Sequence, residues 1–272
     1  MEYKNFIFSL NQNVAEISIN RPEKANSMDE STWMELKQIL LFCTDEPEAR
    51  VVVIKAEGEK IFSAGIDVMN LLMTLRKTVE DKCEGRLREK LRKFILEYQQ
   101  IITLLEKCNK PVIAATHGGC IGAGLDLICA ADMRFCSSDA YFSIKEIDLA
   151  IVADFGTLQR LPKLISDGKA RELAYTGRNM LAVEAEKYGL VNAIFPDKKT
   201  LHEEVMKIAL TIAEKSPLTI RGIKQNILFS RDHNVSDSLE YVANWNASML
   251  FSEDLTRALN ALTTKQKPEY EN

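Results

Sequence analysis

The chain has 272 residues, of which 46% are hydrophobic and 27% are charged, and its net charge is −4. A chain of this length buries about three-quarters of the surface that its unfolded form exposes, so its stability requires neither a metal nor a crosslink. The mild negative charge argues against nucleic acid as the main partner, because phosphate binding needs a concentrated basic face.

The first third of the chain begins with two short strand patterns. Residues 6–10 and 14–19 have the β-type pattern of a hairpin, and they follow the N-terminus without a charged and apolar leader. Ser27 or Asp29 is then expected to cap a helix that continues through residue 40. Residues 51–54 form a continuous apolar run, which is typical of a strand buried on both faces.

A similar order follows in the middle of the chain. Residues 62–67 predict a loop, after which helical segments extend to residue 107. The stretch 77–93 is dense in charge and is expected to be a solvated helix face. Residues 111–115 predict a second buried strand, followed by the glycine-rich stretch 117–124 and a short apolar helix to residue 131.

The last part of the chain is expected to be mostly helical. Strands are predicted only around residues 133–135 and 190–195, and residues 200–264 alternate apolar and charged side chains with a helical period. Ser216 and Ser252 provide capping signals within that region. Strands alternating with helices, followed by a helical tail, predict an α/β core with a helical C-terminal region. No apolar stretch approaches the roughly 20 residues that span a bilayer, so we expect a cytoplasmic protein without a membrane span.

Two glycine-bearing loops are candidates for binding. The spacing of Gly119, Gly122 and Gly124 is the reverse of the dinucleotide fingerprint, so we do not expect a nicotinamide cofactor. The second loop, residues 63–67, also follows a buried strand. Loops on neighbouring strands could each direct one backbone N–H group at a single oxygen, which would form an oxyanion hole. A tight turn without any function remains the alternative for either loop alone.

Three acids are candidates for proton chemistry. Asp126 lies in the first turn of an apolar helix, where it would either complement the helix dipole or need a partner and a raised pKa. Glu146 and Asp154 flank a strongly apolar run, where desolvation would move their pKa values toward neutrality. Asp148 is expected to be exposed. The alternative is that Glu146 and Asp154 are surface acids beside a core strand.

The loops and the acids together resemble the crotonase superfamily, the enoyl-CoA hydratases and isomerases. The matching stretches extend over nearly the whole chain, and they are residues 19–22, 62–67, 110–115, 118–126 and 159–162. The resemblance implies a spiral of ββα repeats with a helical C-terminal region. It divides the chain into a core, residues 1–197, and a helical trimerisation region, residues 198–272.

The resemblance also implies a substrate and a set of site residues. The substrate would be an acyl-CoA thioester, the assembly a homotrimer or homohexamer, and no metal or other cofactor would be needed. The carbonyl oxygen of the thioester would be held by the backbone amides of Ile66 and Ala123. The residues expected to line the path of the CoA moiety are Lys24, Ala25, Ser63, Ala64, Gly65, Asp67, Val68 and Gly122.

The acids indicate which crotonase activity to expect. Hydratases of the superfamily carry Glu at both acid positions and a flexible Gly at a third, whereas this chain has Asp126, Glu146 and Asp154. That set is similar to the set in the dienoyl-CoA isomerases, in which the acids at positions 146 and 154 exchange protons at the two ends of a diene while the acid at position 126 supports the site. The resemblance therefore implies conversion of 3,5-dienoyl-CoA to 2,4-dienoyl-CoA in fatty acid β-oxidation. Hydration of enoyl-CoA, another acyl-CoA isomerisation, and a binding role without chemistry, such as RNA binding, are the alternatives.

Overall fold

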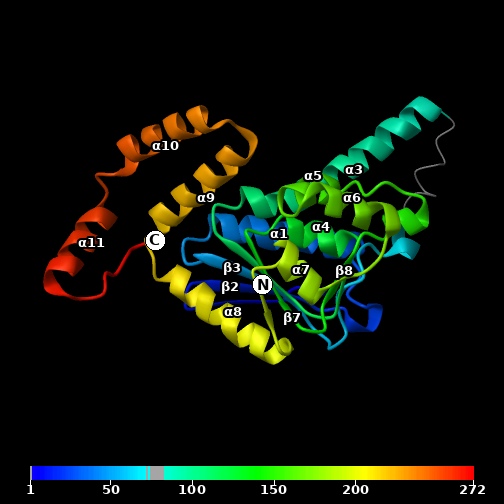
Figure 1. Ribbon diagram of the computed structural model, residues 1–272, viewed down its shortest axis with the longest axis horizontal. Coiled ribbons are helices and arrows are strands. Elements are labelled where there is room, and N and C mark those ends of the chain that lie inside the picture. The colour runs from blue at the N-terminus through cyan, green and yellow to red at the C-terminus, as the bar shows by residue number, and fades with distance from the viewer. Residues whose placement is uncertain (1, 72, 74–82) are drawn as a thin grey trace.

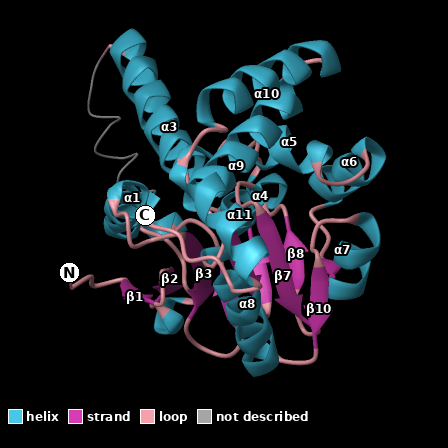
Figure 2. Ribbon diagram, turned by 90° about the vertical axis from the view of Figure 1, so that its left-hand side faces the viewer, coloured by secondary structure: helices cyan, strands magenta, loops and turns pink. Residues whose placement is uncertain are grey.

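The larger of two sheets forms the centre of the fold. The computed structural model describes residues 2–71, 73 and 83–272. The larger sheet has the order β1-β2-β3-β5-β7-β10, and only its first pair is antiparallel (Figure 2). Its strands are β1 (Phe6–Asn11), β2 (Val14–Ile19), β3 (Val51–Ala56), β5 (Val112–Thr116), β7 (Met133–Ser137) and β10 (Ala193–Phe195).

A second, smaller sheet is built from the segments that follow the strands of the first. Its order is β4-β6-β8-β9, and the first three strands are parallel. They are β4 (Ile61–Ser63), β6 (Gly119–Ile121), β8 (Tyr141–Ser143) and β9 (Met180–Leu181). Each parallel strand comes after a strand of the large sheet and before helical structure. This repeated ββα unit confirms the predicted crotonase-type spiral.

Helices surround the two sheets. Those of the body are α1 (Glu30–Asp45), α3 (Glu84–Lys107), α4 (Ala123–Cys129), α5 (Thr157–Arg160), α6 (Asp167–Thr176), α7 (Ala182–Tyr188) and α8 (Lys198–Ala213), with the short 3₁₀ turns η1 (Pro22–Lys24), η2 (Glu146–Leu149) and η3 (Leu161–Lys163). Of the two predicted caps for α1, Asp29 is the one used, because its side chain accepts a 2.9 Å hydrogen bond from Thr32 N.

The large sheet is buried on both faces, as the continuous apolar runs predict. In β3, Val51 and Val53 pack in one cluster with side chains of α8, such as Leu201. The intervening Val52 and Ile54 pack in the other cluster, which contains α1 and α3 side chains such as Trp33. Because successive side chains of a strand point to opposite faces, a strand between two helical layers needs apolar residues throughout.

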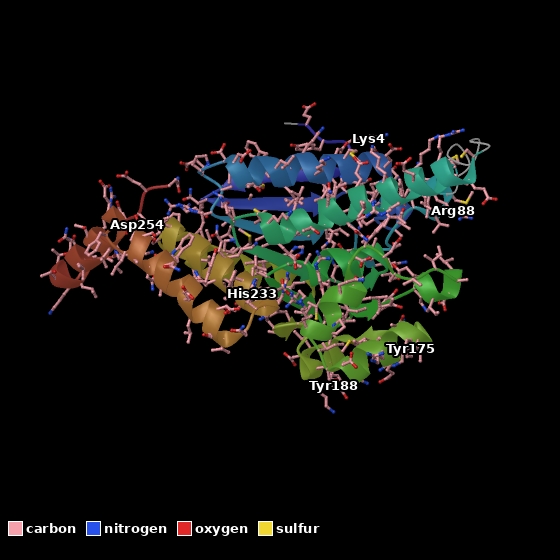
Figure 3. All side chains as sticks on the ribbon, turned by 90° about the horizontal axis from the view of Figure 1, so that it is seen from above. Lys4, Arg88, Tyr175, Tyr188, His233 and Asp254 are labelled. Atoms are coloured by element: carbon pink, nitrogen blue, oxygen red, sulfur yellow. The ribbon has the colours of Figure 1, made fainter. Side chains whose placement is uncertain are left out.

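The last three helices form an extension that we call the C-terminal arm, residues 217–264. It consists of α9 (Pro217–Asp232), α10 (Val235–Met249) and α11 (Glu253–Thr264), and it projects from the body (Figure 1). Seen from above, Asp254 lies toward the end of the molecule opposite Arg88 of α3 (Figure 3). The base of the arm is anchored by Lys224, which is buried and donates hydrogen bonds to Leu105 O, Lys110 O and Asp132 Oδ2.

Some predicted boundaries were wrong. The strand expected over 190–195 begins only at Ala193, and the helix expected to reach residue 131 ends at Cys129. The predicted loops 62–67 and 117–124 contain parts of β4 and β6, which are too short to give a periodic pattern. Within the charged stretch 77–93, residues 77–82 lie outside the described residues, while 84–93 form the largely exposed start of α3.

No helix in the described part of the chain combines the length and the apolar character that a membrane span needs.

Candidate active site

Two adjacent loops bring the predicted oxyanion donors together. Strands β4 and β6 pair in parallel, with Ser63 opposite Cys120, so the residues after both strands leave the same edge of the small sheet. The loop after β4 contains Gly65, at φ +85°. A Cβ atom on Gly65 would lie 2.8 Å from Ile121 O and 3.0 Å from Ala123 N. The two loops are therefore in direct contact at Gly65, and only glycine fits there.

The two amides themselves are available to a ligand. On either side of Ile66, Gly65 O accepts a hydrogen bond from Met28 N, and Asp67 N donates one to Met28 O. Ile66 N itself donates to no acceptor among the described residues. Ala123 is the first residue of α4, where backbone N–H groups have no partner within the helix, and its N–H likewise donates to none of the described residues. The strained backbone at this corner is that of Gly122, with φ 54° and ψ −121°.

Glu146 lies next to this pair of amides. Its carboxyl oxygen Oε1 is 3.0 Å from the position that a Cβ atom on Gly122 would occupy, so the carboxyl group lies against the residue that precedes Ala123. Its other oxygen, Oε2, is buried and has no hydrogen-bond partner among the described residues. Burial raises the pKa of Glu146, and the nearby charge of Asp154 raises it further.

Asp126 is the most deeply buried of the three acids. Only 1% of it is exposed, and it lies in the first turn of α4, as predicted. Its Oδ1 accepts a 2.5 Å hydrogen bond from Thr157 N. Burial raises the pKa of Asp126 to about 7; the charges of Glu146 and Asp154 act in the same direction, whereas hydrogen bonds from Thr157 oppose the shift.

Asp154 lies in the irregular segment between η2 and α5. Burial raises the pKa of its carboxyl group. The backbone carbonyl of Asp154 accepts a 2.6 Å hydrogen bond from Gln99 Nε2, and the next residue, Phe155, packs its ring against Tyr98 of α3 with the centroids 5.5 Å apart. A polar cavity of about 380 Å³ lies beside this segment, lined by Asp154, Gln99 and Arg160 among others.

The three acids thus form one electrostatic cluster. Each has a raised pKa, Glu146 and Asp154 both act on Asp126, and Asp154 acts on Glu146. Like charges that share a partly desolvated site favour the protonated form of at least one member. Such a cluster can hold and exchange protons near neutral pH.

The apolar run between Glu146 and Asp154 does not form the core strand that the alternative interpretation assumed, because it forms η2 and the coil that follows. Ile147, Leu149 and Val152 are exposed in the single chain, to 44%, 51% and 72%. Asp148 is exposed, as expected.

The residues predicted to line the CoA path lie around the β4 loop. Ser63 is buried and donates to Asn26 O, while its hydroxyl also accepts from Gly65 N. Ala64 N donates to Ala25 O at 3.0 Å, which holds the loop beside η1. Lys24 and Val68 are exposed, and Asp67 lies 3.8 Å from Arg21.

Two residues of the site had not been predicted. Thr157 follows Gly156, and no role in the site was expected for it, yet its backbone amide donates a hydrogen bond to Asp126. Gln99 lies on α3 among charged and apolar residues, and nothing in the local pattern distinguishes it from its neighbour Gln100. Only the fold brings it to Asp154.

Known proteins resemble this chain in sequence and in fold. Residues 9–272 match the model of the family described as enoyl-CoA hydratase/isomerase. The chain is 42% identical over 262 residues to the mitochondrial Delta(3,5)-Delta(2,4)-dienoyl-CoA isomerase of Pongo abelii, covering 96% of this chain and 79% of that protein. It is 44% identical over 257 residues to the peroxisomal Delta(3,5)-Delta(2,4)-dienoyl-CoA isomerase of Arabidopsis thaliana, covering 94% and 92%. Among solved structures, an enoyl-CoA hydratase from Bacillus anthracis superposes with a TM-score of 0.89 at 31% identity, covering 98% of this chain and 99% of that one.

Proposed function

The chain belongs to the enoyl-CoA hydratase/isomerase family, and we propose that it is the isomerase that converts 3,5-dienoyl-CoA to 2,4-dienoyl-CoA in fatty acid β-oxidation. An acyl-CoA substrate follows from the family, and the named dienoyl-CoA isomerases that match 94–96% of the chain support the particular reaction. The structural observation that carries the proposal is the position of Glu146. Its carboxyl group lies against Gly122, next to an unbonded backbone amide, within a cluster of three acids with raised pKa values.

The reaction begins at the thioester end of the substrate. The carbonyl oxygen accepts hydrogen bonds from Ile66 N–H and Ala123 N–H, and one carboxylate removes a proton from C2. The electron pair of the broken C–H bond spreads over a conjugated dienolate, and part of its charge resides on the carbonyl oxygen. Each amide that stabilises this charge contributes about 2.7–4 kcal/mol in comparable sites.

The reaction ends at the far end of the diene. The second acid donates its proton to C6, so the double bonds move from C3 and C5 to C2 and C4. We assign C2 to Glu146, because its carboxyl group lies beside Ala123, and C6 to Asp154. Asp126 supports the site through its electrostatic interaction with the carboxyl groups of both acids.

The reaction needs no other cofactor, because one proton leaves carbon, another returns to carbon and no electrons are exchanged. Two acids are needed because C2 and C6 are too far apart for one short side chain to serve both. Hydration is the second candidate, and the superposition with an enoyl-CoA hydratase favours it. Hydration differs from isomerisation in requiring an acid pair that activates a water molecule.

The CoA moiety would lie along η1 and the β4 loop. Lys24 is exposed and forms no ion pair with a described residue, so its ammonium group is available to a phosphate. The main-chain contact between Ala64 and Ala25 would hold the two sides of this path together.

The assembly would be a homotrimer or homohexamer built through the C-terminal arm. Large apolar side chains of the arm region are exposed in the single chain, notably Val235 at 76%, Phe251 at 95% and Leu262 at 77%. Such exposure on adjacent helices is typical of surfaces that are covered by a partner. Light scattering of the purified protein would test this assembly.

Other partners and the compartment remain predictions. The net negative charge of the chain argues against nucleic acid as a partner. The names of the relatives place those proteins in mitochondria and peroxisomes, so they lend no support to a cytoplasmic location.

One assay tests the proposed activity. We expect purified protein to convert 3,5-dienoyl-CoA into a product with the stronger ultraviolet absorbance of a diene conjugated to the thioester. We expect hydration of crotonyl-CoA, measured under the same conditions, to be at least about a hundredfold slower in kcat/KM. A faster hydration of crotonyl-CoA would support the hydratase instead.

A further inference from the structure

We propose that Gln99 is a positioning residue for Asp154, holding the main chain of the segment that carries this acid during proton transfer. The inference rests on the proposed isomerisation and adds to it a residue outside the three acids and two amides. Gln99 lies on α3, 55 residues before Asp154 in the chain.

The segment that carries Asp154 has little structure of its own. It follows η2, which ends at Leu149, and precedes α5, which begins at Thr157. Among the described residues, no backbone amide of residues 152–156 donates a hydrogen bond to a main-chain acceptor, and the amide of Asp154 interacts only with its own carboxyl group. Such a segment must be held by contacts from other elements if its side chain is to keep one direction.

Helix α3 supplies the contacts that hold the segment. Gln99 Nε2 donates a 2.6 Å hydrogen bond to the carbonyl of Asp154. The rings of Tyr98, which precedes Gln99, and Phe155, which follows Asp154, are stacked with their centroids 5.5 Å apart and an interplanar angle of 17°. Arg160, which is paired with Glu106 of α3 at 2.9 Å, also reaches Phe155 O.

These contacts have different consequences for Asp154. The aromatic stack fixes the position of Phe155 but leaves the preceding peptide plane able to rotate. The hydrogen bond from Gln99 fixes that plane, because the carbonyl of Asp154 belongs to it. The plane in turn sets the direction in which the Asp154 side chain leaves the main chain. A displacement of about 1 Å at a reacting group can cost on the order of a hundredfold in rate.

Two substitutions remove the donor at little cost in volume. Gln99→Met keeps the length of the side chain without the amide, and Gln99→Glu keeps its shape but cannot donate when ionised. The matched control is Gln100→Met on the same helix, because Gln100 is exposed and, unlike Gln99, does not line the cavity beside Asp154. Each variant is first compared with the wild type by circular dichroism. If Gln99→Met does not fold, Gln99→Glu provides the same test.

The expected result is a change in kcat rather than KM. We expect Gln99→Met to lower kcat for 3,5-dienoyl-CoA about 10- to 100-fold, while KM stays within about twofold and Gln100→Met matches the wild type. The decisive readout is a double-mutant cycle with Asp154→Asn. If Gln99 acts through the carboxyl group of Asp154, Gln99→Met causes no further loss in the Asp154→Asn background.

Two outcomes would overturn the inference in different ways. Wild-type kcat in a folded Gln99→Met variant, or an equal loss in both backgrounds, would remove Gln99 from the mechanism and leave the proposed function in place. A wild-type protein that does not isomerise 3,5-dienoyl-CoA would overturn both.

Discussion

The backbone amide of Thr157 donates a 2.5 Å hydrogen bond to Oδ1 of Asp126, and this bond joins the start of α5 to the first turn of α4. Asp126 follows the loop that carries one of the two unbonded amides, whereas Thr157 follows the segment that carries Asp154. The bond therefore connects the oxyanion side of the site to the distal acid. Hydrogen bonding from Thr157 does not compensate for the desolvation of this buried carboxyl group, whose pKa is therefore raised.

Replacing Asp126 by Asn should change how stability depends on pH. The folded-state pKa of Asp126 is about 7, above its ordinary value of 3.8, so the folded protein binds more protons than the unfolded chain between these pH values. Stability is therefore lost as pH rises through this window. We therefore expect the unfolding free energy of Asp126→Asn, relative to that of the wild type, to rise by about 1–3 kcal/mol from pH 5 to pH 8.

Urea denaturation of both proteins at pH 5 and at pH 8 measures this difference. The raised pKa would be contradicted if the unfolding free energies of the wild type and of Asp126→Asn changed equally between the two pH values.

Replacing Gly65 by Ala should disrupt both loops of the oxyanion site. The added Cβ atom would lie 2.8 Å from Ile121 O at a φ of +85°, so the backbone must shift and Ala123 N would move with it. We expect kcat/KM for 3,5-dienoyl-CoA to fall at least about a hundredfold, consistent with losing one amide donor.

Gly168→Ala in α6 is the matched control for that substitution. No atom lies within 4 Å of the added Cβ, and the position is helical, so we expect unchanged activity and an equal or slightly higher melting temperature. If Gly65→Ala retained the activity of Gly168→Ala, the contact between the two loops would not matter for catalysis.

The half-buried His202, which lies beside the buried His117, should weaken the fold in mild acid. The rings of His117, which lies between β5 and β6, and His202 of α8 are 6.5 Å apart. Burial lowers the pKa of His202 to about 4, and Lys55 and Lys198 act in the same direction. Below pH 6.5 the unfolded chain binds the proton more readily, so stability is lost as pH falls from about 6.5 to about 4.

The substitution His202→Phe isolates this effect. We expect the wild type to lose about 1–2 kcal/mol more unfolding free energy than the variant between pH 7 and pH 5. The unfolding free energies are measured by chemical denaturation. Equal losses in the two proteins would show that the pKa of His202 is the same in the folded and the unfolded state.

The fold could be predicted where the pattern was long and the motif specific. The continuous run at residues 51–54 indicated a strand buried on both faces, and the structure places helices on both sides of it. The loop at residues 63–67 and the glycine-rich stretch at 117–124 were expected after neighbouring strands, and the preceding strands β3 and β5 do pair in parallel. The strands β4 and β6 were not predicted, because each has only three residues, which is too few to show a period.

The site was predictable for a different reason. Asp126, Glu146 and Asp154 were selected partly through the family resemblance, and the structure brings them into one electrostatic cluster. The apolar run at residues 147–153 does not form the core strand that the alternative interpretation assumed, because it is η2 and coil with mostly exposed side chains. Gln99 could not be found from the sequence, because its contact with Asp154 spans 55 residues and depends on how α3 packs against the loop.

The central claim is that Glu146 and Asp154 act on opposite ends of one acyl chain. It is tested most directly by the kcat/KM of Glu146→Gln and Asp154→Asn for 3,5-dienoyl-CoA. We predict that each folded variant loses on the order of a thousandfold, because each removes one proton-transfer group. A folded variant of either kind that retains activity within about threefold of the wild type would contradict the account.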